Sequence, residues 1–261
     1  MKEFAEYLAS KGLSDDTLKI YLGYLKKFDK GLEENELNQA YVNRFLLTHT
    51  SNSNRAFLNN LFDFLDITDL KVPKLTGRKA RKKKRSLTPE DIEVLGKWLY
   101  HNKGLRYWLL LEISYHCALR RGEVLSIKVK DIGLEEWVKD TSKKCPVLIH
   151  GKGKKERIVL IPPEVMHKVI SYIEKTDKDF EDRLFAFHYK AWHLAFKDAV
   201  RNTMDYNFTL HDLRRSKATE WLKNGLDLIS VRNRLGHTSV KTTQLYINLD
   251  EEQELEKWQN E

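Results

Sequence analysis

The chain has 261 residues, of which 41% are hydrophobic and 32% charged, and its net charge is +8. This length leaves room for one large domain or two modest ones. No apolar run is long enough to cross a bilayer, the N-terminus lacks a secretory signal and only two cysteines are present, so the composition excludes a membrane protein and a disulfide-framed secreted protein, and we expect a cytoplasmic location.

The first 75 residues show helical periodicity. Phe4 and Leu8 lie one helical turn apart, and Ser14, followed by two acidic residues, predicts the start of a longer helix. Further helices are expected around residues 37–47 and 56–65. Residues 1–75 are therefore predicted to form a small bundle of about four helices.

A basic segment follows at residues 76–86. It carries a net charge of +7, whereas residues 1–75 carry −1 and residues 87–261 carry +2. Like charges this crowded predict an extended linker, which could be a solvated tether, although its place between two globular halves favours contact with DNA. The candidate DNA-binding residues in this linker are Arg78, Lys79, Arg81, Lys82, Lys83, Lys84 and Arg85.

Residues 87–261 are predicted to form a second domain. Thr88-Pro89 predicts a helix start, residues 107–118 a buried helix, and residues 210–223 a helix ended by Gly225. Strands are expected at residues 132–138, 147–150 and 158–161, and a glycine-containing turn joins the last two. The fold class is thus predicted to be mainly α with a small antiparallel β-sheet.

Four short patterns in this second domain could carry chemistry, although each has an ordinary interpretation. Arg120, three residues before Glu123, is usually half of a surface pair, and lysines at a hairpin turn are usually solvated. His211 and Arg214 share one helical face and more often form a structural pair. Tyr246, on an amphipathic helix, would normally belong to a core or an interface.

In this order the four patterns are similar to the signature of the tyrosine recombinase family, which includes Xer-type recombinases and phage-type integrases. The resemblance covers residues 88–250. It implies a helical core-binding domain at residues 1–75, the linker at residues 76–86 and a catalytic domain at residues 87–261. The catalytic residues that it implies are Arg120, Lys152, His211, Arg214, His237 and the nucleophile Tyr246.

Attack of a tyrosine on a phosphodiester builds negative charge on the phosphate oxygens, which the planar forks of Arg120 and Arg214 can hold through paired hydrogen bonds. The tyrosine must lose its proton, and His211 is the expected acceptor. The resemblance implies that Lys152 returns a proton to the leaving 5′ oxygen and that His237 bonds the phosphate.

The expected partner is double-stranded DNA, with Lys154 at the hairpin tip as a further contact. The resemblance implies a homo-oligomer, a tetramer on two DNA sites and a monomer or dimer when free. We expect no metal ion, no cofactor and no ATP, because a phosphotyrosine ester retains the bond energy and the sequence lacks a phosphate-binding loop and a carboxylate cluster. The biological role would be chromosome dimer resolution or the movement of a plasmid or viral element.

Two alternatives stay open. One is relaxation of DNA by a type IB topoisomerase-like enzyme, and the other is an inactive DNA-binding accessory protein. The first is disfavoured by residues 249–258, where Leu255 and Trp258 predict a short helix that docks either on a neighbouring protomer or on its own core. Three positions depart from the common family pattern: Ala118 replaces a glycine, Arg215 a histidine, and Lys241 a small polar residue.

Overall fold

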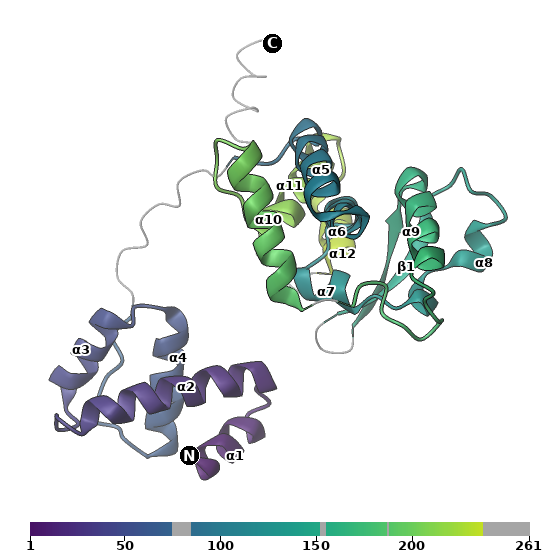
Figure 1. The fold of residues 1–261 in the computed structure, drawn as a ribbon. Coiled ribbons are helices and arrows are strands. Elements are labelled where there is room, and N and C mark those ends of the chain that lie inside the picture. The colour runs from purple at the N-terminus through teal and green to yellow at the C-terminus, as the bar shows by residue number, and fades with distance from the viewer. Residues whose placement is uncertain (75–84, 152–154, 187, 237–261) are drawn as a thin grey trace. The chain divides into compact units, whose positions relative to one another are not determined.

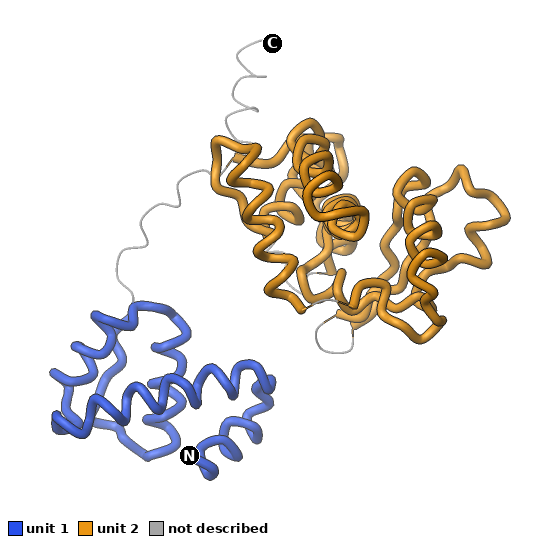
Figure 2. Tube along the Cα trace, in the orientation of Figure 1, with its two compact units in different colours: residues 1–82 blue, residues 83–261 orange. Residues whose placement is uncertain are grey.

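The computed structural model describes residues 1–74, 85–151, 155–186 and 188–236. The chain divides into two compact units, residues 1–82 and residues 83–261 (Figure 2). Within the described residues, no helix combines the length and the apolar character needed to cross a membrane.

The first unit is built from helices that pack around one aromatic core. Phe28 lies at the centre of this core, with ring centroids 5.0 Å from those of both Tyr41 and Phe45 and 6.2 Å from that of Phe57. Ring pairs at these separations contribute beyond their buried area. The helices of this unit are α1 (Lys2–Ser10), α2 (Asp15–Leu32), α3 (Gln39–Thr48) and α4 (Asn52–Phe64).

Local capping explains where two of these helices begin. The side-chain oxygen of Asn38 accepts the Tyr41 N–H at 2.9 Å before α3, and Ser51 Oγ accepts the Asn54 N–H at 3.2 Å before α4. Each cap satisfies a backbone donor that has no partner within its helix.

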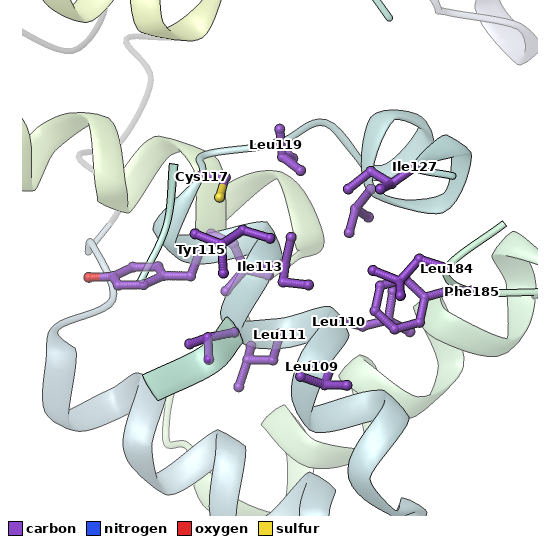
Figure 3. Packing of buried hydrophobic residues seen from close by; sticks show 14 of the residues in the cluster. Leu109, Leu110, Leu111, Ile113, Tyr115, Cys117, Leu119, Ile127, Leu184 and Phe185 are labelled. Atoms are coloured by element: carbon purple, nitrogen blue, oxygen red, sulfur yellow. The ribbon is translucent and has the colours of Figure 1, made fainter. Parts of the chain in front are cut away.

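The second unit is mostly helical. Helix α5 packs against α6 and α10, α6 also packs against α9 and α11, and α11 packs against α12 (Figure 1). The buried core runs from α6 through Leu119 and Ile127 to Phe185 (Figure 3). The helices of this unit are α5 (Pro89–Lys103), α6 (Leu105–His116), α7 (Arg121–Ser126), the 3₁₀ helix η1 (Val129–Asp131), α8 (Leu134–Trp137), α9 (Pro163–Lys175), α10 (Tyr189–Thr203), α11 (Leu210–Lys223) and α12 (Leu228–Leu235).

A β-hairpin accompanies these helices. Strand β1 (Cys145–His150) pairs antiparallel with β2 (Glu156–Ile161), from Cys145 opposite Ile161 to His150 opposite Glu156. The predicted fold class, mainly α with a small antiparallel sheet, is therefore confirmed.

The strand predicted at residues 132–138 is wrong. Only Ile132 forms a bridge, with Val147, and the Gly133 N–H then bonds the Pro146 carbonyl oxygen at 2.9 Å. After Gly133 the chain turns into α8, whose first turn holds two glutamates and which buries Trp137. Acidic residues favour a helix N-terminus, and this local preference together with tryptophan burial replaces the expected strand.

Candidate active site

A buried carboxylate, Glu123, lies at the centre of the candidate site. The Arg120 N–H donates to Glu123 Oε2 at 2.7 Å, and Arg120 Nη1 donates to Oε1 at 2.7 Å. Arg120 is the residue that precedes α7, so Glu123 both caps this helix and holds the arginine. The side chain of Glu123 is only 6% exposed, whereas that of Arg120 is 42% exposed. The surface pair expected from the spacing alone is therefore wrong for the glutamate, which is buried.

A second arginine reaches the same carboxylate from β2. Arg157 donates from Nη1 to Glu123 Oε1 at 3.0 Å and from Nη2 to Oε2 at 2.8 Å. Its Nε also donates to the carbonyl oxygen of Arg234 at 3.1 Å, near the end of α12. Arg157 thus joins the hairpin, α7 and α12 through one side chain.

The third arginine is Arg214 of α11, which is almost fully buried. Its Nη1 donates to the Ala118 carbonyl oxygen at 2.7 Å and its Nη2 to the Leu235 carbonyl oxygen at 2.6 Å, and Nη1 lies 3.6 Å from Glu123 Oε2. Two backbone carbonyls and a carboxylate therefore orient this side chain within the protein itself.

Two backbone conformations place those carbonyl groups. Ala118 has φ +48°, in the left-handed region that residues with a Cβ rarely adopt. Gly236, with φ +62°, ends α12, and a Cβ there would lie 3.1 Å from Arg157 Cδ. Glycine is favoured at position 236 both by the backbone conformation and by the close approach of Arg157.

The charged groups of this centre leave a net positive charge. Burial opposes ionisation of Glu123, but hydrogen bonds from Arg157 and from the backbone N–H of Arg120 outweigh it and lower the pKa of Glu123 to about 2. Three arginines and one ionised glutamate leave a net charge of +2. This charge matches what a phosphodiester under attack would require.

His211 lies in the first turn of α11, one turn from Arg214. Desolvation lowers the pKa of His211, and the positive charge of Arg214 acts in the same direction. The imidazole is thus kept neutral near pH 7 and can accept a proton. The structure brings three of the predicted catalytic residues, Arg120, His211 and Arg214, to one place.

The other three predicted catalytic residues, Lys152, His237 and Tyr246, lie outside the described residues. The described residues end directly before the first two of these in the sequence. Next to Lys152, the Gly151 N–H donates to the Lys155 carbonyl oxygen at 2.7 Å and closes the end of the hairpin. Gly236 directly precedes His237.

Most of the predicted DNA-binding residues also lie outside the described residues: Arg78, Lys79, Arg81, Lys82, Lys83, Lys84 and Lys154. Arg85 is described, and its side chain is 45% exposed. Its guanidinium bonds both carboxylate oxygens of Asp91, at 3.0 and 3.1 Å, and lies 3.2 Å from Asp205. The structure therefore places Arg85 in an ion-pair network within the second unit.

Helix α10 carries a basic stripe that was not predicted from the sequence. Lys190, His193, Lys197 and Arg201 are all exposed and follow one another at spacings of three and four, which places them along one face of the helix. Asp198 is the one acidic residue of α10, and it is paired with Lys103. The spacing of the basic residues was the signal that could have revealed this face.

Solved structures with a similar fold include recombinases bound to DNA. One is the XerH site-specific recombinase bound to palindromic difH substrate (TM-score 0.75, 22% identity, 92% of this chain and 78% of that chain). Another is a lambda integrase tetramer bound to a Holliday junction (TM-score 0.69, 16% identity, 94% of this chain and 75% of that chain). The chain therefore shares the fold of these recombinases.

The sequence comparisons agree with the fold. Residues 85–253 match the model of the phage integrase family. The chain is 26% identical to a tyrosine recombinase of Pseudothermotoga lettingae (98% of this chain, 96% of the relative) and 28% identical to the tyrosine recombinase XerA of Pyrococcus horikoshii (94% and 87%). The chain belongs to the phage integrase family and is a tyrosine recombinase similar to the Xer enzymes.

Proposed function

We propose that the protein is a site-specific recombinase that cuts and rejoins double-stranded DNA through a 3′-phosphotyrosine intermediate, with Tyr246 as the nucleophile. The observation that carries this proposal is the convergence of Arg120 and Arg214 on the buried Glu123 carboxylate, beside a histidine whose pKa is lowered. Such a centre suits a phosphate whose negative charge grows during attack.

The reaction proceeds in two symmetrical steps. Tyr246 attacks the scissile phosphorus, His211 accepts the phenolic proton, and the bond to the 5′ oxygen breaks as Lys152 supplies a proton to the leaving group. Arg120 and Arg214 hold the non-bridging oxygens, with His237 as a further hydrogen-bond donor. In the second step the 5′ hydroxyl of another strand attacks the phosphotyrosine and releases the tyrosine. One phosphodiester is broken and one is formed, so the reaction needs no ATP or other energy source.

The distribution of basic residues along the chain supports a DNA partner. The basic linker, residues 76–86, supplies positive charge, and Lys154, between β1 and β2 in the sequence, and the α10 stripe supply more. Strand exchange requires two DNA sites and four active tyrosines, so we propose a homotetramer on DNA. The titles of the similar XerH and lambda integrase structures, with their difH substrate and Holliday junction, support a DNA partner and assembly on it.

The decisive experiment traps the covalent intermediate. A nicked suicide duplex carrying the recombination site should form a protein–DNA adduct with the wild type and none with Tyr246→Phe, and the adduct should map to the 3′ phosphate. An adduct that persists in Tyr246→Phe removes that residue from its role. A 5′ linkage contradicts the proposed polarity.

A second assay separates recombination from DNA relaxation. Two-site DNA should give crossed products, and the yield should depend on the presence of both sites. Relaxation of plasmid that lacks any preferred site, without strand exchange, would instead favour a topoisomerase-like activity.

A further inference from the structure

The end of the basic linker and the residue after it are bonded to α11. Arg215 Nη2 donates to the Arg85 carbonyl oxygen at 2.5 Å, and the Leu87 N–H donates to Ser216 Oγ at 2.8 Å. Leu87 and Ser216 are both buried. Two consecutive residues of α11 thus hold two backbone groups of residues 85–87, which we call the junction segment.

Arg215 is oriented by its own helix. Its Nε donates to Asp212 Oδ1 at 3.2 Å, and Asp212 Oδ2 accepts bonds from the backbone N–H and the hydroxyl of Thr209 at 2.8 and 2.7 Å. Asp212, Arg215 and Ser216 stand at spacings of three and four and share one face of α11. His211, in the same first turn, lies on the neighbouring face.

The junction segment is also bonded on its other side. The Arg85 guanidinium pairs with Asp91 in the first turn of α5, and the Thr88 N–H donates to Asp91 Oδ2 at 2.9 Å. The chain therefore leaves the linker between α5 and α11, with polar contacts to both helices. A displacement of residues 85–87 would disturb the first two turns of α11.

We infer that Arg215 and Ser216 are positioning residues that couple DNA contact by the basic linker to the placement of His211 and Arg214. This inference rests on the proposed function and adds to it a mechanical link between DNA binding and the phosphate site. A linker laid along the DNA backbone fixes the junction segment, and the junction segment fixes the start of α11. A shift of about 1 Å in a reacting group costs on the order of a hundredfold in rate, so a small displacement is enough.

The side chain at position 215 suits this role. A guanidinium offers five N–H donors in a rigid fork and reaches Asp212 and the Arg85 carbonyl at once. A histidine at this position is shorter and has only two ring nitrogens, so it cannot reproduce both bonds with the same geometry. The coupling is therefore tied to the arginine of this chain.

The test compares Arg215→Ala and Arg215→Lys with the wild type, each with the native linker and with Lys82, Lys83 and Lys84 all changed to serine. Single-turnover adduct formation is measured on a suicide duplex at saturating DNA, and DNA affinity is measured separately. Both Arg215 variants should form adduct about ten- to a hundredfold more slowly, with affinity within about threefold of wild type. Linker neutralisation should slow adduct formation at saturation in the wild type and should have no further effect in the Arg215 variants.

A matched control and a structural readout complete the test. Arg183→Ala removes an exposed arginine that belongs to neither α5, α11 nor the junction segment, and it should leave the rate and the linker effect unchanged. Amide hydrogen exchange of residues 214–219 in the free protein should be faster in Arg215→Ala and in Ser216→Ala but not in the control. The inference would be overturned if linker neutralisation slowed adduct formation by the same factor in the wild type and in the Arg215 variants. It would also be overturned if amide exchange of residues 214–219 were unchanged in those variants. Absence of any wild-type adduct would overturn the proposed function. The amide exchange result would still test whether Arg215 and Ser216 hold the start of α11 to the junction segment.

Discussion

Arg157 donates both of its terminal nitrogens to the carboxylate of Glu123, at 3.0 and 2.8 Å. The two residues lie 34 positions apart, on β2 and α7, and both side chains are largely buried. A buried carboxylate is tolerated when its charge is fully hydrogen-bonded. The pair therefore stabilises the arrangement in which Arg120 and Arg214 lie against the same carboxylate.

Replacing Arg157 should weaken both the fold and the reaction. Arg157→Met leaves Glu123 with fewer charged donors, and loss of hydrogen bonds to a buried charge should lower the free energy of unfolding by about 2 kcal/mol. Urea unfolding measures this change. The double variant Arg157→Met with Glu123→Gln should be more stable than additivity predicts, because the unpaired charge is gone. Strict additivity would show that the two residues do not interact.

Glu123 should contribute a defined acid-sensitive part of the stability. Its pKa is about 2 in the folded protein, against an ordinary value of 4.5, so its contribution is complete above pH 4.5 and is lost as the pH falls towards 2. The difference corresponds to about 3 kcal/mol. Unfolding free energies measured from neutral pH downward should therefore fall less steeply for Glu123→Gln. The exposed Glu174→Gln should follow the wild type, and identical slopes for all three proteins would contradict the assignment.

The rate of cleavage should report the protonation of His211. Because desolvation and Arg214 lower its pKa below 6.5, the neutral, proton-accepting form persists into mildly acidic solution, and the rate should fall only below that pH. Single-turnover adduct formation across this range gives the profile. His211→Gln should lose about a hundredfold in rate together with the acidic limb. His101→Gln, at an exposed position of α5, should retain the wild-type rate and the acidic limb of the pH–rate profile. An acidic limb that persists in His211→Gln would show that another group is the base.

The basic stripe of α10 should bind DNA phosphates. Lys197→Ser and Arg201→Ser should each weaken binding to any duplex and reduce the slope of log affinity against log salt by about one. Fluorescence anisotropy over a salt series measures both quantities. Lys175→Ser removes an exposed lysine from α9 and serves as the matched control. Unchanged slopes for the α10 variants would exclude phosphate contacts there.

The parts of the fold with local signals could be predicted from the sequence. Helix α11 matches the predicted residues 210–223, because Gly225 marks its end and the pattern before it is periodic. The strand at residues 132–138 was mispredicted because a segment this short, with its apolar residues interrupted by two glutamates, does not distinguish a strand from a helix. The four-residue α8 depends on the packing of Trp137, which no local pattern reveals.

The candidate site was predicted only in part for a related reason. Arg120, His211 and Arg214 stand in recognisable local motifs, whereas Arg157 carries no such mark and gains its role through a partner distant in sequence. Glu123 could be recognised as a partner of Arg120, but the spacing of the two residues indicated an exposed pair, whereas Glu123 is buried. Burial of that pair is a property of the packed elements, so the sequence pattern alone could not distinguish the two outcomes.

The left-handed backbone conformation at Ala118 limits which residues position 118 can accept. A residue with a Cβ in that conformation costs roughly 1 kcal/mol relative to glycine, and the buried methyl group, packed near Ala218 and Val231, returns a similar amount. Glycine and alanine are therefore close to interchangeable at this position. Every larger side chain meets both a strained backbone and a filled core, and it also moves the carbonyl that orients Arg214. In a mutational library, codon 118 should accept little beyond these two residues, even though it encodes no reactive group.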